Sequence, residues 1–129
     1  MVVDASVLVA LLSDAGEAGL WAESLLESNH WVAPHLAVVE AANVLRRLEL
    51  SGRLDKLEAV SALLDLNDLP LELLPFAPFA DRVWQLRANI TSYDALYVAI
   101  AEALDQPLAT LDRKLSTASA PRCEFITRH

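Results

Sequence analysis

The feature that most constrains the fold is the alternation of short apolar segments with longer segments of helical spacing. Alanine (21 residues) and leucine (25) fill 46 of the 129 positions, and both favour helix. Because parallel neighbouring strands need crossover connections, this alternation predicts an α/β layer structure with a mostly parallel sheet. The apolar segments are continuous runs, which is typical of a sheet covered on both faces. We expect five short strands, at residues 1–3, 31–33, 71–74, 108–111 and 124–126.

Helical spacing recurs between these strands. Residues 36–50 predict a strong helix that stops at Gly52, and residues 55–66 predict an antiparallel partner helix after a turn. Further helices are expected over 17–27, 78–88 and 91–104. The length fits one domain, and no linker or repeat interrupts the chain, so we expect a single domain over residues 1–129.

Composition excludes several classes of protein. The chain carries 18 acidic and 10 basic side chains, a formal net charge of −8, which argues against a generic nucleic-acid coat. Apolar residues make up 54 % of the chain, which excludes disorder. The single cysteine, Cys123, forms no internal disulfide and suits a reducing compartment. The apolar start contains Asp4 and lacks a basic region, so we expect no signal peptide, no membrane span and a cytoplasmic location.

Two acidic residues directly follow predicted strands. Asp4 comes after the strand at 1–3, and Asp112 comes after the strand at 108–111. Open α/β sheets place ligand-binding groups at the carboxyl ends of their strands. The alternative is structural, because aspartate is also a preferred helix-capping and turn residue.

A third acid, Glu40, lies on the apolar face of the helix at 36–50. Its neighbours at helical spacing include Leu36 and Val44, so an ionised side chain there carries a large desolvation cost. The carboxylate therefore needs a cation, a hydrogen-bond network or a raised pKa. A buried ion pair with Arg47 is the competing explanation.

The fourth acid, Asp94, begins a helix that is apolar almost all round until Glu102. Such a helix is expected to lie centrally, against the sheet. Thr91 stands three residues before Asp94, which is the spacing of a capping box and offers a structural alternative.

Taken together, these four acids indicate a site for a hard divalent cation. Carboxylates held close together at one sheet repel one another, and Mg²⁺ or Mn²⁺ relieves that repulsion. Zinc is disfavoured because His30, His35 and His129 lack ligand spacing. A carboxylate site of this kind activates water for phosphodiester cleavage.

The same residues carry a family resemblance over essentially the whole chain. Asp4–Ala5–Ser6, then VVEAANVLRR around Glu40, ITSYDALYVAIAEAL around Asp94 and ATLDRKL around Asp112 resemble the PIN-domain ribonucleases. Within that family the pattern looks most like the VapC-type toxins of bacterial toxin–antitoxin pairs. The resemblance implies a three-layer α/β/α sandwich, a homodimer, endoribonuclease activity that depends on Mg²⁺ or Mn²⁺, and a cognate antitoxin that blocks the acidic site.

By position, the resemblance implies a role for each acid. Asp4 and Asp94 would be the principal metal ligands, and Asp112 a third ligand, direct or through water. Glu40 would hold a metal or orient the attacking water.

Two further residues are expected to contact substrate. Ser6 would hydrogen-bond a water or a phosphate, although a role in starting the helix is an alternative, and Arg113 would bind RNA. The chain departs from many relatives at Lys114 and Leu115, where they carry another acid or an aromatic residue. We therefore expect a single metal ion.

Two other functions compete with this one. The first is a catalytically silent module whose acidic pocket binds a basic segment of a partner. The second is a phosphoacceptor signalling domain, which needs paired acids after the first strand, where only Asp4 stands. The favoured prediction is a metal-dependent endoribonuclease that acts as a toxin.

Overall fold

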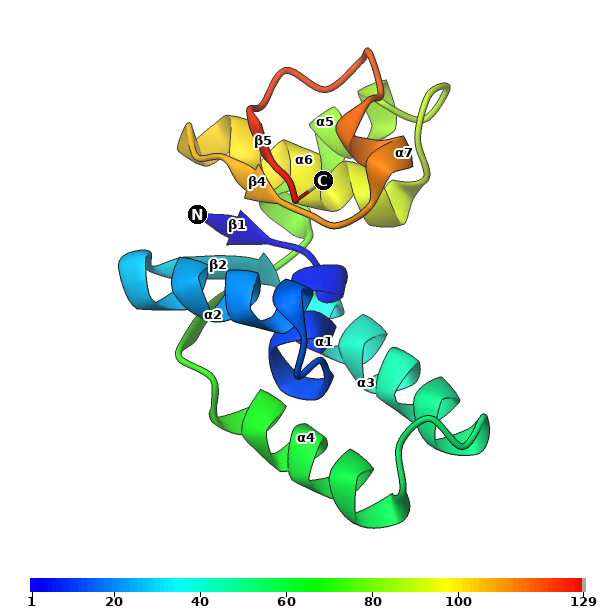
Figure 1. Cartoon of the computed structure of the whole chain (residues 1–129). Coiled ribbons are helices and arrows are strands. Elements are labelled where there is room, and N and C mark those ends of the chain that lie inside the picture. Colours follow the sequence, from blue (N-terminus) through cyan, green and yellow to red (C-terminus); the bar gives the residue numbers. More distant parts are fainter. Residues whose placement is uncertain (129) are drawn as a thin grey trace.

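A five-stranded parallel sheet forms the centre of the molecule (Figure 1). The computed structural model describes residues 1–128, and the prediction about His129 lies outside the described residues. The spatial order of the strands is β3-β2-β1-β4-β5. The strands are β1 (Val2–Val3), β2 (Trp31–Pro34), β3 (Leu71–Leu74), β4 (Leu108–Ala109) and β5 (Phe125–Ile126).

Helices cover both faces of this sheet. The chain proceeds from β1 outward to β2 and β3, then returns across the sheet to β4 and continues to β5. Because crossovers are right-handed, the two directions of travel place their helices on opposite faces. Figure 1 shows α2 in front of β2 and α6 behind β4. The predicted three-layer α/β/α fold is therefore confirmed. The helices are α1 (Ala5–Ser13), α2 (Glu17–Ser28), α3 (His35–Leu50), α4 (Lys56–Asp68), α5 (Ala80–Gln85), α6 (Ser92–Leu104) and α7 (Arg113–Ser116).

Helix α6 is the central helix, as its sequence predicts. Seven consecutive residues from Ala95 to Ala101 are buried, and the helix packs across β1, β2 and β4. On the other side, α3 and α4 form an antiparallel pair that extends away from the sheet (Figure 1). This pair has a small core of its own, made by Leu45, Leu54 and Ala62. The main core joins buried residues of the strands and α6 with buried residues of α1, α2 and α3.

Two segments near the predicted site differ from their predicted extents, while the other predicted bounds lie within two residues of the observed ones. The helix expected over 78–88 is divided into a 3-10 turn (Ala77–Phe79) and the short α5, which ends before Leu86. The strand expected over 108–111 ends at Ala109, and the side chain of the next residue, Thr110, hydrogen-bonds Asp4, which follows β1. Both differences reshape the region around the predicted site.

Helices α1 and α2 meet at a sharp corner. Gly19 is buried there, and a Cβ atom at this position would lie 1.7 Å from the carbonyl oxygen of Asp14. The close approach of the two helices therefore requires glycine. In the described part of the chain no single helix is long and apolar enough to cross a membrane; only α1 and α2 together pass that test, as a pair bent by 110°.

Candidate active site

The site lies where the order of the strands reverses. From β1 the chain moves toward β2, whereas from β4 it moves toward β5, so the carboxyl ends of β1 and β4 border a topological switch point. Open α/β sheets bind ligands in the crevice at such a point. Asp4 follows β1 directly, and Asp112 follows β4 after two residues.

Asp4 is a buried carboxylate and caps α1. Its Oδ1 accepts hydrogen bonds from the backbone N–H groups of Ser6 (3.0 Å) and Val7 (3.3 Å), so the capping prediction is confirmed. Only 7 % of the residue is exposed. Burial raises the pKa of Asp4 above its usual value, despite hydrogen bonds from Ser6, Thr110 and Val7 that lower it. No Lys, Arg or His among residues 1–128 forms an ion pair with it.

Hydroxyl groups tie Asp4 to the residues after β4. The fully buried Thr110 donates to Oδ2 of Asp4 and accepts from the backbone N–H of Asp112 (3.0 Å). Ser6 Oγ donates to Oδ1 of Asp4 and accepts from the backbone N–H of Leu111 (3.0 Å). The two strand ends are thereby fixed relative to each other. The sequence alone does not single out Thr110, because its only signal is a polar side chain near the end of an apolar strand.

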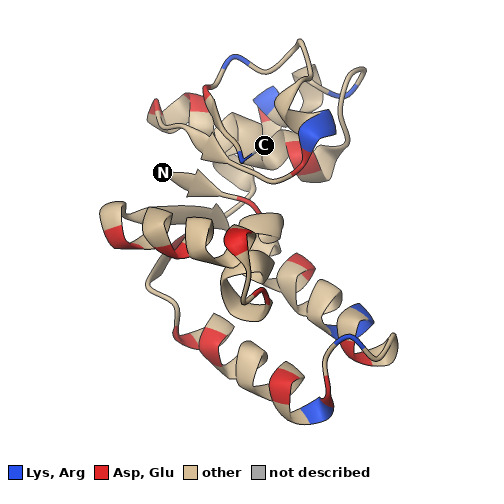
Figure 2. Ribbon diagram, viewed as in Figure 1, with Lys and Arg blue, Asp and Glu red and all other residues tan. Residues whose placement is uncertain are grey.

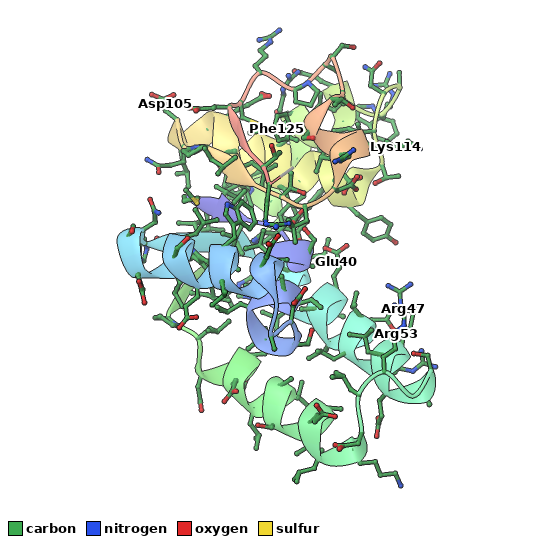
Figure 3. All side chains as sticks on the ribbon, viewed as in Figure 1. Glu40, Arg47, Arg53, Asp105, Lys114 and Phe125 are labelled. Atoms are coloured by element: carbon green, nitrogen blue, oxygen red, sulfur yellow. The ribbon has the colours of Figure 1, made fainter. Side chains whose placement is uncertain are left out.

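The carboxylate of Glu40 is held from across the fold. Tyr97, in the middle of α6, is 1 % exposed, and its hydroxyl donates to Oε1 of Glu40 at 2.5 Å. Burial raises the pKa of Tyr97 above its usual value, and the nearby carboxylates of Glu40 and Asp4 raise it further. The hydroxyl of Tyr97 therefore stays protonated at neutral pH and donates its hydrogen bond to Glu40. The alternative of an ion pair with Arg47 is not found in residues 1–128, and Figure 3 shows Arg47 further along α3.

Asp94 and Asp112 form a like-charged pair. Burial raises the pKa of Asp94, and the neighbouring charge of Asp112 raises it further, while Thr91 and Lys114 oppose the shift. Thr91 caps α6 by accepting from the backbone N–H of Asp94 (3.3 Å). The exposed Asp112 caps α7, and its Oδ1 accepts from the backbone N–H groups of Lys114 (2.9 Å) and Leu115 (3.2 Å).

The fold thus brings the four predicted acids to one end of the sheet in two groups. Asp4 and Glu40 lie near Tyr97, and Asp94 lies near Asp112. Within residues 1–128 no three His, Cys, Asp or Glu side chains stand close enough to hold a metal ion together. The four side chains nevertheless suit a hard cation, because all of them offer oxygen ligands. Asp4 is buried with no cationic side chain paired to it in residues 1–128, and Asp94 and Asp112 repel each other.

A surface groove adjoins the second group. Its volume is about 660 Å³, and both Asp94 and Asp112 line it. Its basic side chains are those of Arg87 and Lys114, and the predicted substrate ligand Arg113 is not among the lining residues. Figure 2 shows the basic start of α7 beside the acidic start of α6.

Ser6, the other predicted substrate ligand, has a structural contact. Its hydroxyl proton points to Asp4. A phosphate oxygen also needs a donor, so Ser6 would have to release Asp4 in order to donate to a phosphate. The geometry favours the alternative role at the start of α1.

Comparisons with known proteins agree with this fold. The family model described as "PIN domain" matches residues 1–120. The chain is 41 % identical over 125 residues to ribonuclease VapC1 of Mycobacterium tuberculosis, a match that covers 96 % of this chain and 94 % of the relative.

Solved structures show the same architecture. The crystal structure of PAE2754 from Pyrobaculum aerophilum matches with a TM-score of 0.73 and 25 % identity, covering 96 % of this chain and 81 % of the other. VapBC2 from Rickettsia felis, bound to a DNA fragment from the promoter, matches with a TM-score of 0.68 and 18 % identity, covering 98 % and 96 % of the two chains. The chain therefore belongs to the PIN-domain family and, within it, to the VapC type.

Proposed function

We propose that this protein is a metal-dependent endoribonuclease that cleaves RNA phosphodiester bonds by water attack, as the toxin of a type II toxin–antitoxin pair. The observation that carries the proposal is the position of four acids from separate elements at the switch point of the sheet. The relative with 41 % identity is named a ribonuclease, which supports the same activity for this chain.

Asp4, Asp94 and Asp112 are the residues proposed to hold one Mg²⁺ or Mn²⁺ ion. When bound, such an ion lowers the pKa of a coordinated water and offsets the charge that develops on the phosphate. The buried Asp4 and the repelling pair of Asp94 and Asp112 support this choice, because each places negative charge where a cation is needed.

Residues of the chain orient the reacting groups. Tyr97 occupies one oxygen of Glu40, so the second oxygen of that carboxylate is the one available to orient a water and accept its proton. Thr110 and Ser6 hold both oxygens of Asp4 and so fix the direction of this ligand. In this proposal Glu40 is the general base, whereas Asp4 is a metal ligand.

The proposed partners are an RNA substrate, a cognate antitoxin and a second copy of the chain in a cytoplasmic homodimer. Apolar side chains exposed along α4 support a protein partner, since contiguous exposed apolar surface is uncommon on a monomer. These side chains are Leu57, Val60, Leu63 and Leu64. Light scattering of the purified protein, alone and with the antitoxin, measures the assembly.

Cleavage of labelled RNA in Mg²⁺ or Mn²⁺ tests the activity. Asp94→Asn should lower the rate by more than about 100-fold, because loss of a group that merely supports a ligand already costs 10–100-fold. Asp105→Asn is the matched control: it caps the carboxyl end of the same helix, about 16 Å away (11 residues at ~1.5 Å each), in a left-handed conformation that asparagine accepts. Cleavage that persists both in EDTA and in Asp94→Asn would refute the proposal.

A silent binding module is the second candidate. The observation in its favour is that the acids, in the described part of the chain, form no three-ligand cluster. Titration with Mn²⁺ separates the two candidates, because the nuclease binds the ion through Asp4 and Asp94 whereas the silent module does not. Absence of both Mn²⁺ binding and RNA cleavage would favour the module.

A further inference from the structure

We infer that the groove beside Asp94 and Asp112 binds an unpaired RNA nucleotide next to the cleaved bond, with Arg87 and Lys114 as its phosphate ligands. This inference rests on the proposed ribonuclease function and adds two phosphate ligands to the four acids of that site. Neither residue follows from the four-acid pattern.

The groove joins acids and cations from separate parts of the chain. Arg87 comes from the turn after α5, whereas Lys114 comes from α7, and both line the same groove of about 660 Å³ as the acidic pair. Figure 3 shows Lys114 on α7, beside the start of α6. Polar side chains of Asn89, Thr117 and Ser119 also line the groove and supply hydrogen-bonding groups for a sugar or base. A volume of this size falls within the range of small-ligand sites.

Arg87 is held in place without being neutralised. Its Nη1 donates to the backbone carbonyl of Trp84 at 2.7 Å, and its guanidinium lies 4.7 Å from the centre of the exposed Trp84 ring. No carboxylate of residues 1–128 forms an ion pair with it. By contrast, Arg82 is bound by Glu102. The remaining N–H groups of Arg87 are therefore free to bind a phosphate, the ligand that suits its planar fork.

Lys114 stands on the acidic side of the groove. Its backbone N–H donates to Asp112, which fixes the start of its side chain, and its charge is near enough to Asp94 to affect that group. Within residues 1–128 the ammonium group is in no ion pair. A phosphate that contacts Lys114 would thus lie next to the proposed metal ligands.

The rest of the molecule explains why the occupant is a short unpaired stretch. With a net charge of −8, most of the surface repels an RNA backbone, so favourable contacts are confined to a few phosphates. Acids at the wall of a concave groove are accessible to a nucleotide that has left its stack. In an A-form duplex the bases stay stacked inside a narrow, deep major groove, so they cannot enter a concave groove on the protein.

Binding of a fluorescent single-stranded oligoribonucleotide, measured by anisotropy in Mg²⁺ at several salt concentrations, tests the inference. Asp94→Asn protein serves as the uncleaving background. We expect Arg87→Ala and Lys114→Ala each to raise Kd by about 5–10-fold and to reduce the salt slope by about 0.7, the value for one contact to a single strand. Arg87→Lys should retain the slope, since it keeps the charge.

Arg53→Ala and Lys56→Ala are the matched controls, because these cations lie at the far end of the α3–α4 pair (Figure 3 labels Arg53). They should leave both Kd and slope unchanged. A duplex of the same sequence should bind at least about 10-fold more weakly.

The outcomes separate this inference from the proposed function. Unchanged Kd and slope in Arg87→Ala and Lys114→Ala, with cleavage by the wild type intact, would overturn the groove assignment alone. Equal binding of duplex and single strand would overturn the unpaired form of the substrate. Absence of both RNA cleavage and RNA binding by the wild type would refute the ribonuclease proposal itself.

Discussion

The hydrogen bond from Tyr97 to Glu40 gives the sharpest test of how the fold positions its proposed base. Tyr97→Phe removes only the hydroxyl group, and the phenyl ring still fills the buried space below the strand ends. We expect this variant to fold, to be less stable, and to cleave RNA more slowly with an unchanged KM. The reason for the last effect is that Glu40 would then sample other rotamers.

The magnitude follows from the surroundings of the two groups. A hydrogen bond to a charged group contributes about 1.5–3 kcal/mol. Glu40 is only half-buried, so water can replace the lost donor, and the expected loss in free energy of unfolding is about 1–2 kcal/mol. For a domain of this length the loss corresponds to a decrease in Tm of about 3–8 °C. The same energy expressed in the rate is a decrease of roughly 5–30-fold.

A double-mutant cycle with Glu40→Ala isolates the interaction, with urea denaturation as the assay. Once Glu40 is removed, the buried hydroxyl of Tyr97 has no acceptor, so Tyr97→Phe should cost little or even stabilise the protein. Tyr93→Phe is the matched control, since Tyr93 is 62 % exposed on the same helix, and it should change the stability by less than about 0.5 kcal/mol. Additive single changes, within about 0.5 kcal/mol, would refute the coupling.

Two further predictions concern stability. Gly19→Ala places a Cβ atom 1.7 Å from the Asp14 carbonyl, so an overpacking cost of about 3 kcal/mol or more should outweigh the ~1 kcal/mol gain in helix propensity and lower the urea midpoint. Gly52→Ala is the comparison, because Gly52 lies in open space at φ +80° and the change should cost only about 1–2 kcal/mol. Equal urea midpoints for Gly19→Ala and Gly52→Ala would contradict the predicted clash at Gly19. Burial raises the pKa of Glu102, but hydrogen bonds from Arg82 and from a backbone N–H outweigh this effect and lower the pKa overall. The ionised Glu102 therefore stabilises the fold fully above the pKa of about 4.3 that it has in the unfolded chain. This stabilisation is lost as the pH falls through the lower pKa that Glu102 has in the folded protein. Glu102→Gln should therefore reduce the difference in unfolding free energy between pH 7 and pH 3, and an unchanged difference would disprove this role.

The features of the fold that could be predicted are those that depend on the local sequence pattern. Apolar runs and helical spacing located the five strands and the central burial of α6, because burial of a continuous segment leaves a periodic signal in the chain itself. The resemblance to the PIN-domain family and to VapC-type proteins is confirmed by the family model, which matches residues 1–120, and by the relative with 41 % identity. The expected helix over 78–88 was too long, since its end depends on how the chain turns beside α6.

The unpredictable part of the site depends on pairs that are distant in sequence. Thr110 reaches Asp4 across 106 positions, and Tyr97 reaches Glu40 across 57. Such contacts exist only because β1 pairs with β4 and α6 crosses the sheet, and neither fact is encoded near the residues themselves. The basic side of the groove is another example, because Arg87 follows a short helix whose end the sequence did not reveal.

The sequence offered capping and metal binding as rival explanations for Asp4 and Asp112, but the geometry shows why one residue can serve both. Each caps a short helix with Oδ1, and the donors are neutral N–H and O–H groups. Neutral donors fix the direction of a carboxylate without cancelling its charge, so burial still raises the pKa of Asp4. A cap at the carboxyl end of a strand therefore holds a charge rigidly at the switch point of the sheet, the place where an open α/β fold receives its ligand. On this argument the capping role favours, rather than opposes, the proposal that a cation completes the site.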